Sequence, residues 1–333
     1  MTLAFSSLVT LFSVVIGVFW AWVLSRTDFP LKKQFRTWTS LPYAIPPFIG
    51  AISWIYLANP SNGLINQYLG TGFLNIYSFT GLVFVETSFL YTFVFLSTSS
   101  ALDLMDSSFE EAARTSGATP VQTFFKITLP LIFPSILNSA LLVFLAVIAS
   151  FGVPALIAGP AGFKVMTTEI YQLQKMGTMS GLQTSILLAS LLLLFSILII
   201  FISQFLNSQK KMSLVTGKTA RPSLIKLKNL KPFFVTGLVL FLGVVLLAPF
   251  LGVLLSATSQ VQGHLAFNNF TFNHFHRVLF ETDEIYRAFT NSLIMAASAA
   301  FLCTRLPAFR RRGASHFSPR SSHRPARILR VDE

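Results

Sequence analysis

Seven apolar segments, each close to the length that crosses a lipid bilayer, restrict this chain more than any other feature. They are residues 3–25, 37–58, 79–102, 131–152, 181–206, 233–256 and 288–304. A helix needs about 20 apolar residues to span the hydrocarbon core. The composition agrees, since 11% of the residues are charged, against about 25% in a soluble domain. We therefore expect an all-α, polytopic membrane protein with about seven transmembrane helices.

The charges between these segments predict the orientation of the chain. The loops at 26–36 and 207–232 are rich in Lys and Arg, whereas those at 59–78 and 153–180 carry few basic residues. By the positive-inside rule, 26–36, 103–130 and 207–232 are cytoplasmic. The loop at 153–180 is long enough for a short surface or re-entrant helix. The net charge of +13 therefore reflects topology better than nucleic-acid binding. The lone Cys303 excludes an intramolecular disulfide.

The stretch EEAARTSGATPVQTFFKITLP, residues 110–130, is a polar island in an apolar chain. Glu110 and Glu111 fall in the first turn of an expected helix, where carboxylates are favourable. Asp106, Ser107 or Ser108 could provide the cap of that helix.

The residues that follow favour two short helices and then a membrane span. Ala112 and Ala113 present a thin surface that permits close approach of a partner. Gly117 allows the chain to turn between the helices. Pro130 is expected to start the next span, because proline is favoured at a helix N-terminus. An ordinary amphipathic loop helix remains the alternative.

The same loop matches the pattern E-A-A-x(3)-G-x(9)-I-x-L-P, which resembles the signature of inner-membrane permease subunits of type I bacterial ABC importers. The resemblance implies that this loop is a coupling helix that docks into a groove of an ATPase subunit and passes on its movement. The implied docking residues are Glu110, Glu111, Ala112, Ala113, Gly117, Ile127, Leu129 and Pro130.

The resemblance also implies the setting of the chain. It would lie in the bacterial cytoplasmic (inner) membrane, without cofactor or metal, and would itself catalyse no reaction. Its partners would be a cytoplasmic ABC ATPase subunit, an extracytoplasmic substrate-binding protein and, for an incomplete chain, a second permease chain. Residues 26–54 and 151–171 resemble the ferric-iron branch, whose chains are fused duplications, so ferric iron is the expected cargo. Thiamine, polyamine and aminophosphonate importers share this architecture.

The resemblance suggests four regions. Residues 1–206 would form the first half without its first span, 207–232 a basic cytoplasmic linker, and 233–304 the start of a second half. Residues 1–13 resemble 291–303, as a duplication implies. The Arg-rich residues 305–333 differ in composition from the rest, and we interpret them as a disordered, frameshifted tail. The alternatives are a tail that binds anionic lipid and a non-functional remnant of the permease.

Three further features of the sequence are functional candidates. Glu86 lies inside the segment 79–102, where an ionisable group is expensive. It could line the translocation path or couple transport to an ion gradient, or it could be protonated or paired across helices. His274 and His276 lack a third ligand, so no metal site is expected. The sequence TGKT at 216–219 lacks the first glycine of a phosphate-binding loop, because residue 212 is Met.

Overall fold

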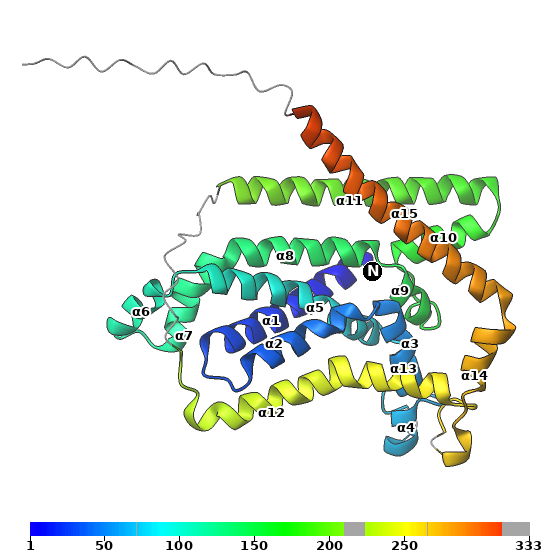
Figure 1. Ribbon diagram of the computed structural model, residues 1–333, viewed down its shortest axis with the longest axis horizontal. Helices are drawn as coiled ribbons and strands as arrows, with labels where there is room; N and C mark the ends of the chain where they lie inside the picture. Colours follow the sequence, from blue (N-terminus) through cyan, green and yellow to red (C-terminus); the bar gives the residue numbers. More distant parts are fainter. Residues whose placement is uncertain (71, 210–223, 265, 315–333) are drawn as a thin grey trace, which may run out of the picture. The chain divides into compact units, whose positions relative to one another are not determined.

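The computed structural model describes residues 1–70, 72–209, 224–264 and 266–314. It forms two units, Met1–Phe270 and Thr271–Glu333, which are described separately below. In the described part of the chain the regular elements are helices (Figure 1), and the only β-type pairings are two isolated bridges. The predicted all-α class is therefore confirmed.

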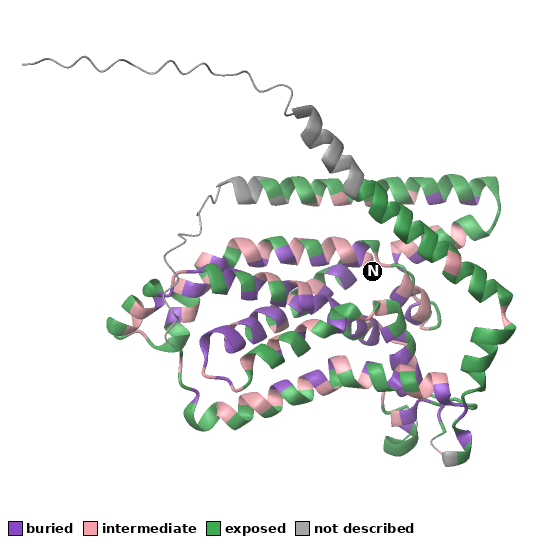
Figure 2. Cartoon of the chain, in the orientation of Figure 1, coloured by how far each residue is buried: buried purple, intermediate pink, exposed green. Residues whose placement is uncertain are grey.

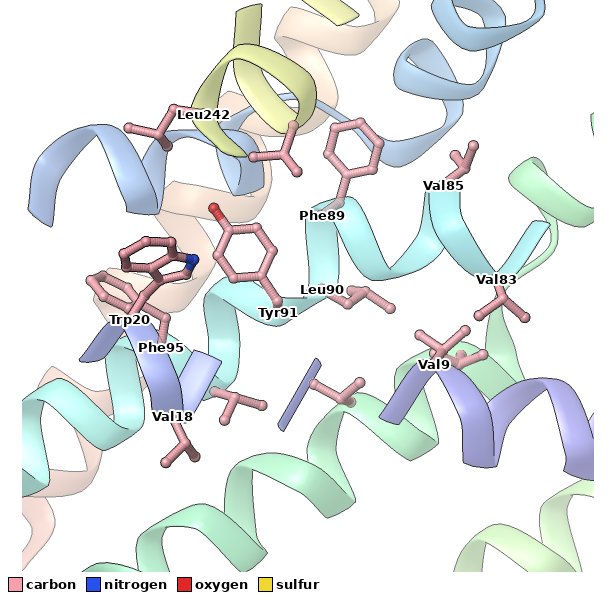
Figure 3. Close-up of a cluster of buried hydrophobic side chains, with 14 of the residues drawn as sticks. Val9, Val18, Trp20, Val83, Val85, Phe89, Leu90, Tyr91, Phe95 and Leu242 are labelled. Atoms are coloured by element: carbon pink, nitrogen blue, oxygen red, sulfur yellow. The ribbon is translucent and has the colours of Figure 1, made fainter. Parts of the chain in front are cut away.

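The centre of the first unit is a bundle of three long helices. They are α1 (Thr2–Arg26), α5 (Phe79–Leu104) and α8 (Leu129–Ala149), and each packs against the other two. Figure 3 shows buried side chains from α1 and α5, among them Trp20 and Tyr91. At Gly17 a Cβ atom would lie 2.8 Å from Cβ of Val94. Glycine therefore allows the close approach of α1 to α5.

Within the described residues, five helical stretches are long and apolar enough to cross a membrane. They are Thr2–Arg26, Phe79–Leu104, Pro120–Ala149, Met179–Ile202 and Lys228–Thr258. A sixth is obtained if the bent pair Lys32–Ala44 and Pro47–Ala58 counts as one span. The sequence predicts about seven, and the difference lies in the segments 37–58 and 288–304.

The predicted span 37–58 is not one straight helix. It divides into α2 (Lys32–Ser40), η1 (Leu41–Ala44) and α3 (Pro47–Ala58), with a bend of 91° between the two parts. Pro46 and Pro47 lie at the break. Neither has a backbone N–H, so neither can continue the helical hydrogen bonds of η1. The expectation of a continuous span at this place was wrong.

The predicted span 288–304 lies in the second unit, inside α15 (Asp283–Ala314). The described part of α15 is not among the candidate spans, because its first turns carry Asp283, Glu284 and Arg287 and several polar side chains follow. The same unit contains α14 (Asn273–His276) and the π-helical turn η6 (Arg277–Glu281).

The backbone of α15 continues through residues 305–314. The interpretation of residues 305–333 as a disordered, frameshifted tail remains a prediction. Residues 315–333 and the TGKT sequence lie outside the described residues, and the proposed four-region organisation remains a prediction.

The loops expected on the outer face contain short helices. The loop 59–78 holds α4 (Leu64–Leu69), and 153–180 holds α9 (Gly152–Ile157) and α10 (Met166–Lys175), in agreement with the predicted surface helix. After them, α11 (Met179–Gln209) is exposed along most of its described length, as Figure 2 shows. Its apolar side chains are suited to a lipid or protein environment rather than to water.

The end of the basic linker is attached to the loop that follows α1. Ile225 and Thr27 form a parallel bridge, and the N–H of Ile225 donates to the carbonyl of Arg26 at 2.9 Å. The carboxylate of Asp28 accepts the N–H of Leu227 at 2.8 Å and lies 3.5 Å from Nζ of Lys231. These contacts, led by the Leu227 hydrogen bond, hold the pKa of Asp28 below its ordinary value.

The linker then leads into the last span of the first unit. This span consists of η3 (Lys228–Leu230), α12 (Lys231–Leu242), the π-helical turn η4 (Gly243–Leu247) and α13 (Ala248–Thr258). α13 packs against α3. A short η5 (Phe267–Asn269) follows.

Candidate functional site

The loop between α5 and α8 is a compact arrangement of three short elements. They are α6 (Ser108–Thr115), α7 (Pro120–Thr123) and the π-helical turn η2 (Phe124–Thr128). Glu110 and Glu111 lie in the first turn of α6, as expected. Of the three capping candidates, Asp106 accepts a backbone hydrogen bond, from the N–H of Ser108 at 2.9 Å.

A glycine turn connects α6 to α7. Gly117 has a φ of 87°, a conformation that glycine adopts without the steric penalty of a side chain. Its N–H donates to the carbonyl of Arg114, and the N–H of Ala118 donates to that of Ala113, both at 3.0 Å. These two bonds form a Schellman motif, which satisfies the last carbonyls of α6. The turn expected at Gly117 is therefore present.

α7 begins with a capping box. The hydroxyl of Thr119 accepts the N–H of Gln122, and the side-chain oxygen of Gln122 accepts the N–H of Thr119. A capping box satisfies two helix-terminal donors at once. The Schellman motif thus fixes the end of α6 and the capping box fixes the start of α7, so the two helices hold a defined geometry.

Glu110 does not belong to the exposed surface of this loop. Its side chain is 6% exposed, and its Oε2 lies 2.8 Å from Nε of Arg26. The Nε–H does not point along this contact, so the attraction is electrostatic rather than a directed hydrogen bond. Thr128 donates its hydroxyl to Oε1 at 2.6 Å. Glu110 is thus held by contacts within the chain, and its part in docking remains a prediction.

The other predicted docking residues differ in exposure. Ala112 and Gly117 are exposed, and Glu111 and Ala113 are half-buried. Ile127 is also half-buried, and Leu129 packs against the hydrophobic core of the first unit. Only part of the sequence motif is thus available to another protein, and the remainder holds the loop against the spans.

Three large apolar side chains of the loop were missed by the motif. Phe109, Val121 and Phe125 are exposed, the last two by 62% and 61%. Exposed large apolar side chains on a loop that is otherwise polar are candidates for contact with another surface. Their apolar character inside a polar stretch was the available signal in the sequence.

Pro130 lies in the first turn of α8, as expected, but the helical stretch extends further towards the N-terminus. The apolar helical stretch begins at Pro120 and continues to Ala149, with η2 inside it. The N–H of Leu129 bonds to the carbonyl of Phe124, five residues earlier, so the helix is locally widened just before the proline. Such a π-turn accommodates the missing donor and the bulk of a proline ring within a continuous helix. Pro120 is the first residue of α7, where the whole stretch begins.

Glu86 is buried inside α5. The hydroxyl of Ser150, just after α8, donates to its Oε1, so it is paired across helices. An apolar cavity of about 590 Å³ lies between α1, α5 and the span that contains η4, and Glu86 is not among its lining residues. A role for Glu86 in the pathway remains a prediction.

The histidine pair lies in the second unit. Nδ1 of His276 lies 3.2 Å from Oε1 of Glu281. The described residues contain no group of three side chains suited to a metal ion.

Comparison with known proteins identifies the family. Residues 13–212 match the family described as "Binding-protein-dependent transport system inner membrane component". The chain is 34% identical over 230 residues to the sn-glycerol-3-phosphate transport system permease protein UgpA of Salmonella typhimurium, covering 63% of this chain and 74% of that protein. It is 30% identical over 202 residues to the sulfate transport system permease protein CysT of Escherichia coli, covering 59% and 73%.

A ferric relative is also similar. The putative ferric transport system permease protein FbpB 1 of Haemophilus influenzae is 29% identical over 247 residues, covering 72% of this chain and 38% of that protein.

Two crystal structures of bacterial alginate ABC transporters contain chains with a similar fold. One, in complex with a periplasmic protein bound to an alginate pentasaccharide, has a TM-score of 0.50 at 22% identity, covering 65% of this chain and 78% of that chain. The other has a TM-score of 0.51 at 21% identity, covering 64% and 77%. With the resemblance thus confirmed, the chain belongs to the binding-protein-dependent inner-membrane components, the permease subunits of ABC importers, and is a multi-pass protein of the inner membrane.

Proposed function

We propose that this permease binds a cytoplasmic ABC ATPase through the loop of residues 106–130 and forms the path for a solute delivered by an extracytoplasmic binding protein. The observation that supports docking is the form of the loop. Capping bonds and a Schellman motif fix two short helices, and the first of them exposes a side chain as small as that of Ala112. A rigid, thin helix can enter a groove and transmit a rigid-body movement.

The exposed apolar side chains fit the same role. Phe109, Val121 and Phe125 belong to α6, α7 and η2, so all three elements contribute apolar surface. Buried apolar anchors surrounded by polar contacts are typical of stable protein interfaces. We infer that they add affinity, while Ala112 permits the close approach.

Ferric iron is the cargo that we propose. The alignment with the ferric permease of Haemophilus influenzae covers 72% of this chain, more than the 63% and 59% covered by the glycerol-phosphate and sulfate relatives. The chain spans 38% of that ferric relative's length. The cargo is tested by uptake of radiolabelled ferric iron, sulfate and sn-glycerol 3-phosphate in cells that depend on this chain. Uptake of sulfate or glycerol phosphate instead of iron would overturn the cargo proposal alone.

Docking is tested by co-purification. A tagged chain should retain the ATPase of its transport system, and Glu111→Arg or Gly117→Pro should release it. Glu86→Gln is the matched control, because Glu86 lies in α5 away from the loop and should leave the ATPase bound. Retention of the ATPase by both loop variants, when these are inserted at normal levels, would contradict the proposal. Uptake that is abolished by Glu86→Gln but insensitive to the loop variants would favour ion-coupled transport.

A further inference from the structure

The coupling helix α6 has few direct contacts with α1, α5 and α8. It packs chiefly against α7 and η2, the first elements of the helical stretch that continues into α8. Any movement imposed on α6 must nevertheless reach the spans if the loop is to drive transport. The side chains that connect α6 to elements outside the loop therefore determine how firmly the movement is transmitted.

One buried ion pair makes such a connection. Glu110 extends from α6 to Arg26, the last residue of α1, and the two side chains are 6% and 3% exposed. Arg26 also donates from Nη2 to the carbonyl of Leu102, near the end of α5, at 2.8 Å. Thr128, directly before α8, donates its hydroxyl to Glu110 at 2.6 Å. A single carboxylate of the coupling helix thus joins the cytoplasmic ends of α1, α5 and α8.

The same cluster reaches the linker. Ile225 lines a small pocket together with Arg26, Glu110 and Thr128. Its N–H donates to the carbonyl of Arg26, and its carbonyl accepts the N–H of Asp28. This pairing covers the ion pair from the linker side. It also connects the cluster through a short stretch of chain to α12, the beginning of the last span of the first unit.

We propose that Glu110 is a positioning residue whose ion pair with Arg26 transmits the movement of the coupling helix to α1, α5 and α8. This inference rests on the proposed docking of an ATPase at the loop. Removal of water from the pair strengthens its electrostatic attraction, and the shared hydrogen bonds fix its geometry. The pair therefore resists separation when α6 is displaced, so α6 and the three helix ends move as one body.

The chain offers a matched control pair. Arg36 and Asp103 are connected by two hydrogen bonds of 2.8 and 2.9 Å and link α2 to the end of α5. Their side chains are 31% and 50% exposed, so water screens their attraction. Neither residue belongs to α6. Asp103→Asn removes the same charge as Glu110→Gln but leaves the connection from α6 to the spans intact.

The experiment uses the complete transport complex reconstituted in proteoliposomes. The variants are Glu110→Gln, the conservative Glu110→Asp and the control Asp103→Asn. Two quantities are measured: the amount of ATPase that co-purifies with the chain, and the factor by which cargo-loaded binding protein stimulates ATP hydrolysis. The first reports docking, and the second reports transmission between the outer face and the ATPase.

We expect Glu110→Gln to retain the ATPase but to lose about tenfold in stimulation, a size typical of coupling between linked sites. Glu110→Asp should recover part of the stimulation, and Asp103→Asn should behave as the unmodified chain. Normal stimulation in Glu110→Gln would overturn the inference, and so would loss of the ATPase from that variant. Failure of the unmodified chain to retain the ATPase would instead overturn the proposed docking.

Discussion

Replacing Glu110 with alanine removes one partner of the buried pair and leaves the Arg26 guanidinium, which is 3% exposed, without its counter-charge. Breaking a buried ion pair in this way costs about 3–5 kcal/mol. The hydroxyl of Thr128 also loses its acceptor. Asp103→Ala breaks the exposed pair with Arg36, for which the cost should be about 0–1 kcal/mol. The two alanine variants should therefore differ by at least about 2 kcal/mol in unfolding free energy.

The assay is unfolding of the purified chain in mixed micelles by titration with sodium dodecyl sulfate, followed by circular dichroism. A double-mutant cycle with Arg26→Met and Glu110→Met isolates the interaction from the effects of each side chain. Because the double variant leaves no buried charge at this place, it should be more stable than either single variant. Additive effects of the two substitutions, or an equal cost for Glu110→Ala and Asp103→Ala, would refute the reasoning.

Three further predictions concern the turn, the helix packing and the linker. Gly117→Ala should destabilise the α6–α7 turn by about 1–2 kcal/mol, because Gly117 has positive φ. Gly117→Asn should destabilise it by less, because Asn tolerates positive φ. Hydrogen exchange of the loop amides measures both effects. Gly17→Ala places its Cβ 2.8 Å from Cβ of Val94 in α5 and should lower the free energy of unfolding by about 1–3 kcal/mol in the same assay. Gly243→Ala is the control and should be tolerated, because its Cβ would have no other atom within 4 Å. Asp28→Asn should speed amide exchange at Leu227 at neutral pH, because it removes the carboxylate that accepts this N–H. The pKa of Asp28 is lowered from 3.8, so the stabilising effect of the carboxylate is present above about pH 4. It is lost as the pH falls through the lowered pKa. Unchanged exchange in Gly117→Ala or Asp28→Asn, or equal stability of Gly17→Ala and Gly243→Ala, would contradict the corresponding contact.

Hydropathy and one motif were sufficient to predict the membrane class, most of the spans and the helix–turn–helix form of the loop. These features depend on properties of neighbouring residues, such as the length of apolar runs and the freedom of Gly117 to adopt positive φ. The bend between η1 and α3 was signalled by Pro46 and Pro47, but hydropathy does not register a break between two apolar helices.

The burial of Glu110 could not be predicted in the same way. It depends on Arg26 and Thr128, which come from other parts of the sequence and meet Glu110 only after α1 and α8 have packed together. In sequence Arg26 is an ordinary basic residue at the end of an apolar span, where it only indicates orientation. The π-turn directly before α8 was missed for a related reason, because it is a property of the folded helix.

The most direct test of docking at the 106–130 loop is site-specific photo-crosslinking in intact membranes. A photoreactive residue replaces the exposed Ala112 in α6 and, as the control, Tyr68 in α4, which is 70% exposed in a loop expected on the outer face. The account predicts a covalent adduct with the ATPase subunit from position 112 and none from position 68. The absence of an ATPase adduct at position 112, or equal adducts at both positions, would contradict it.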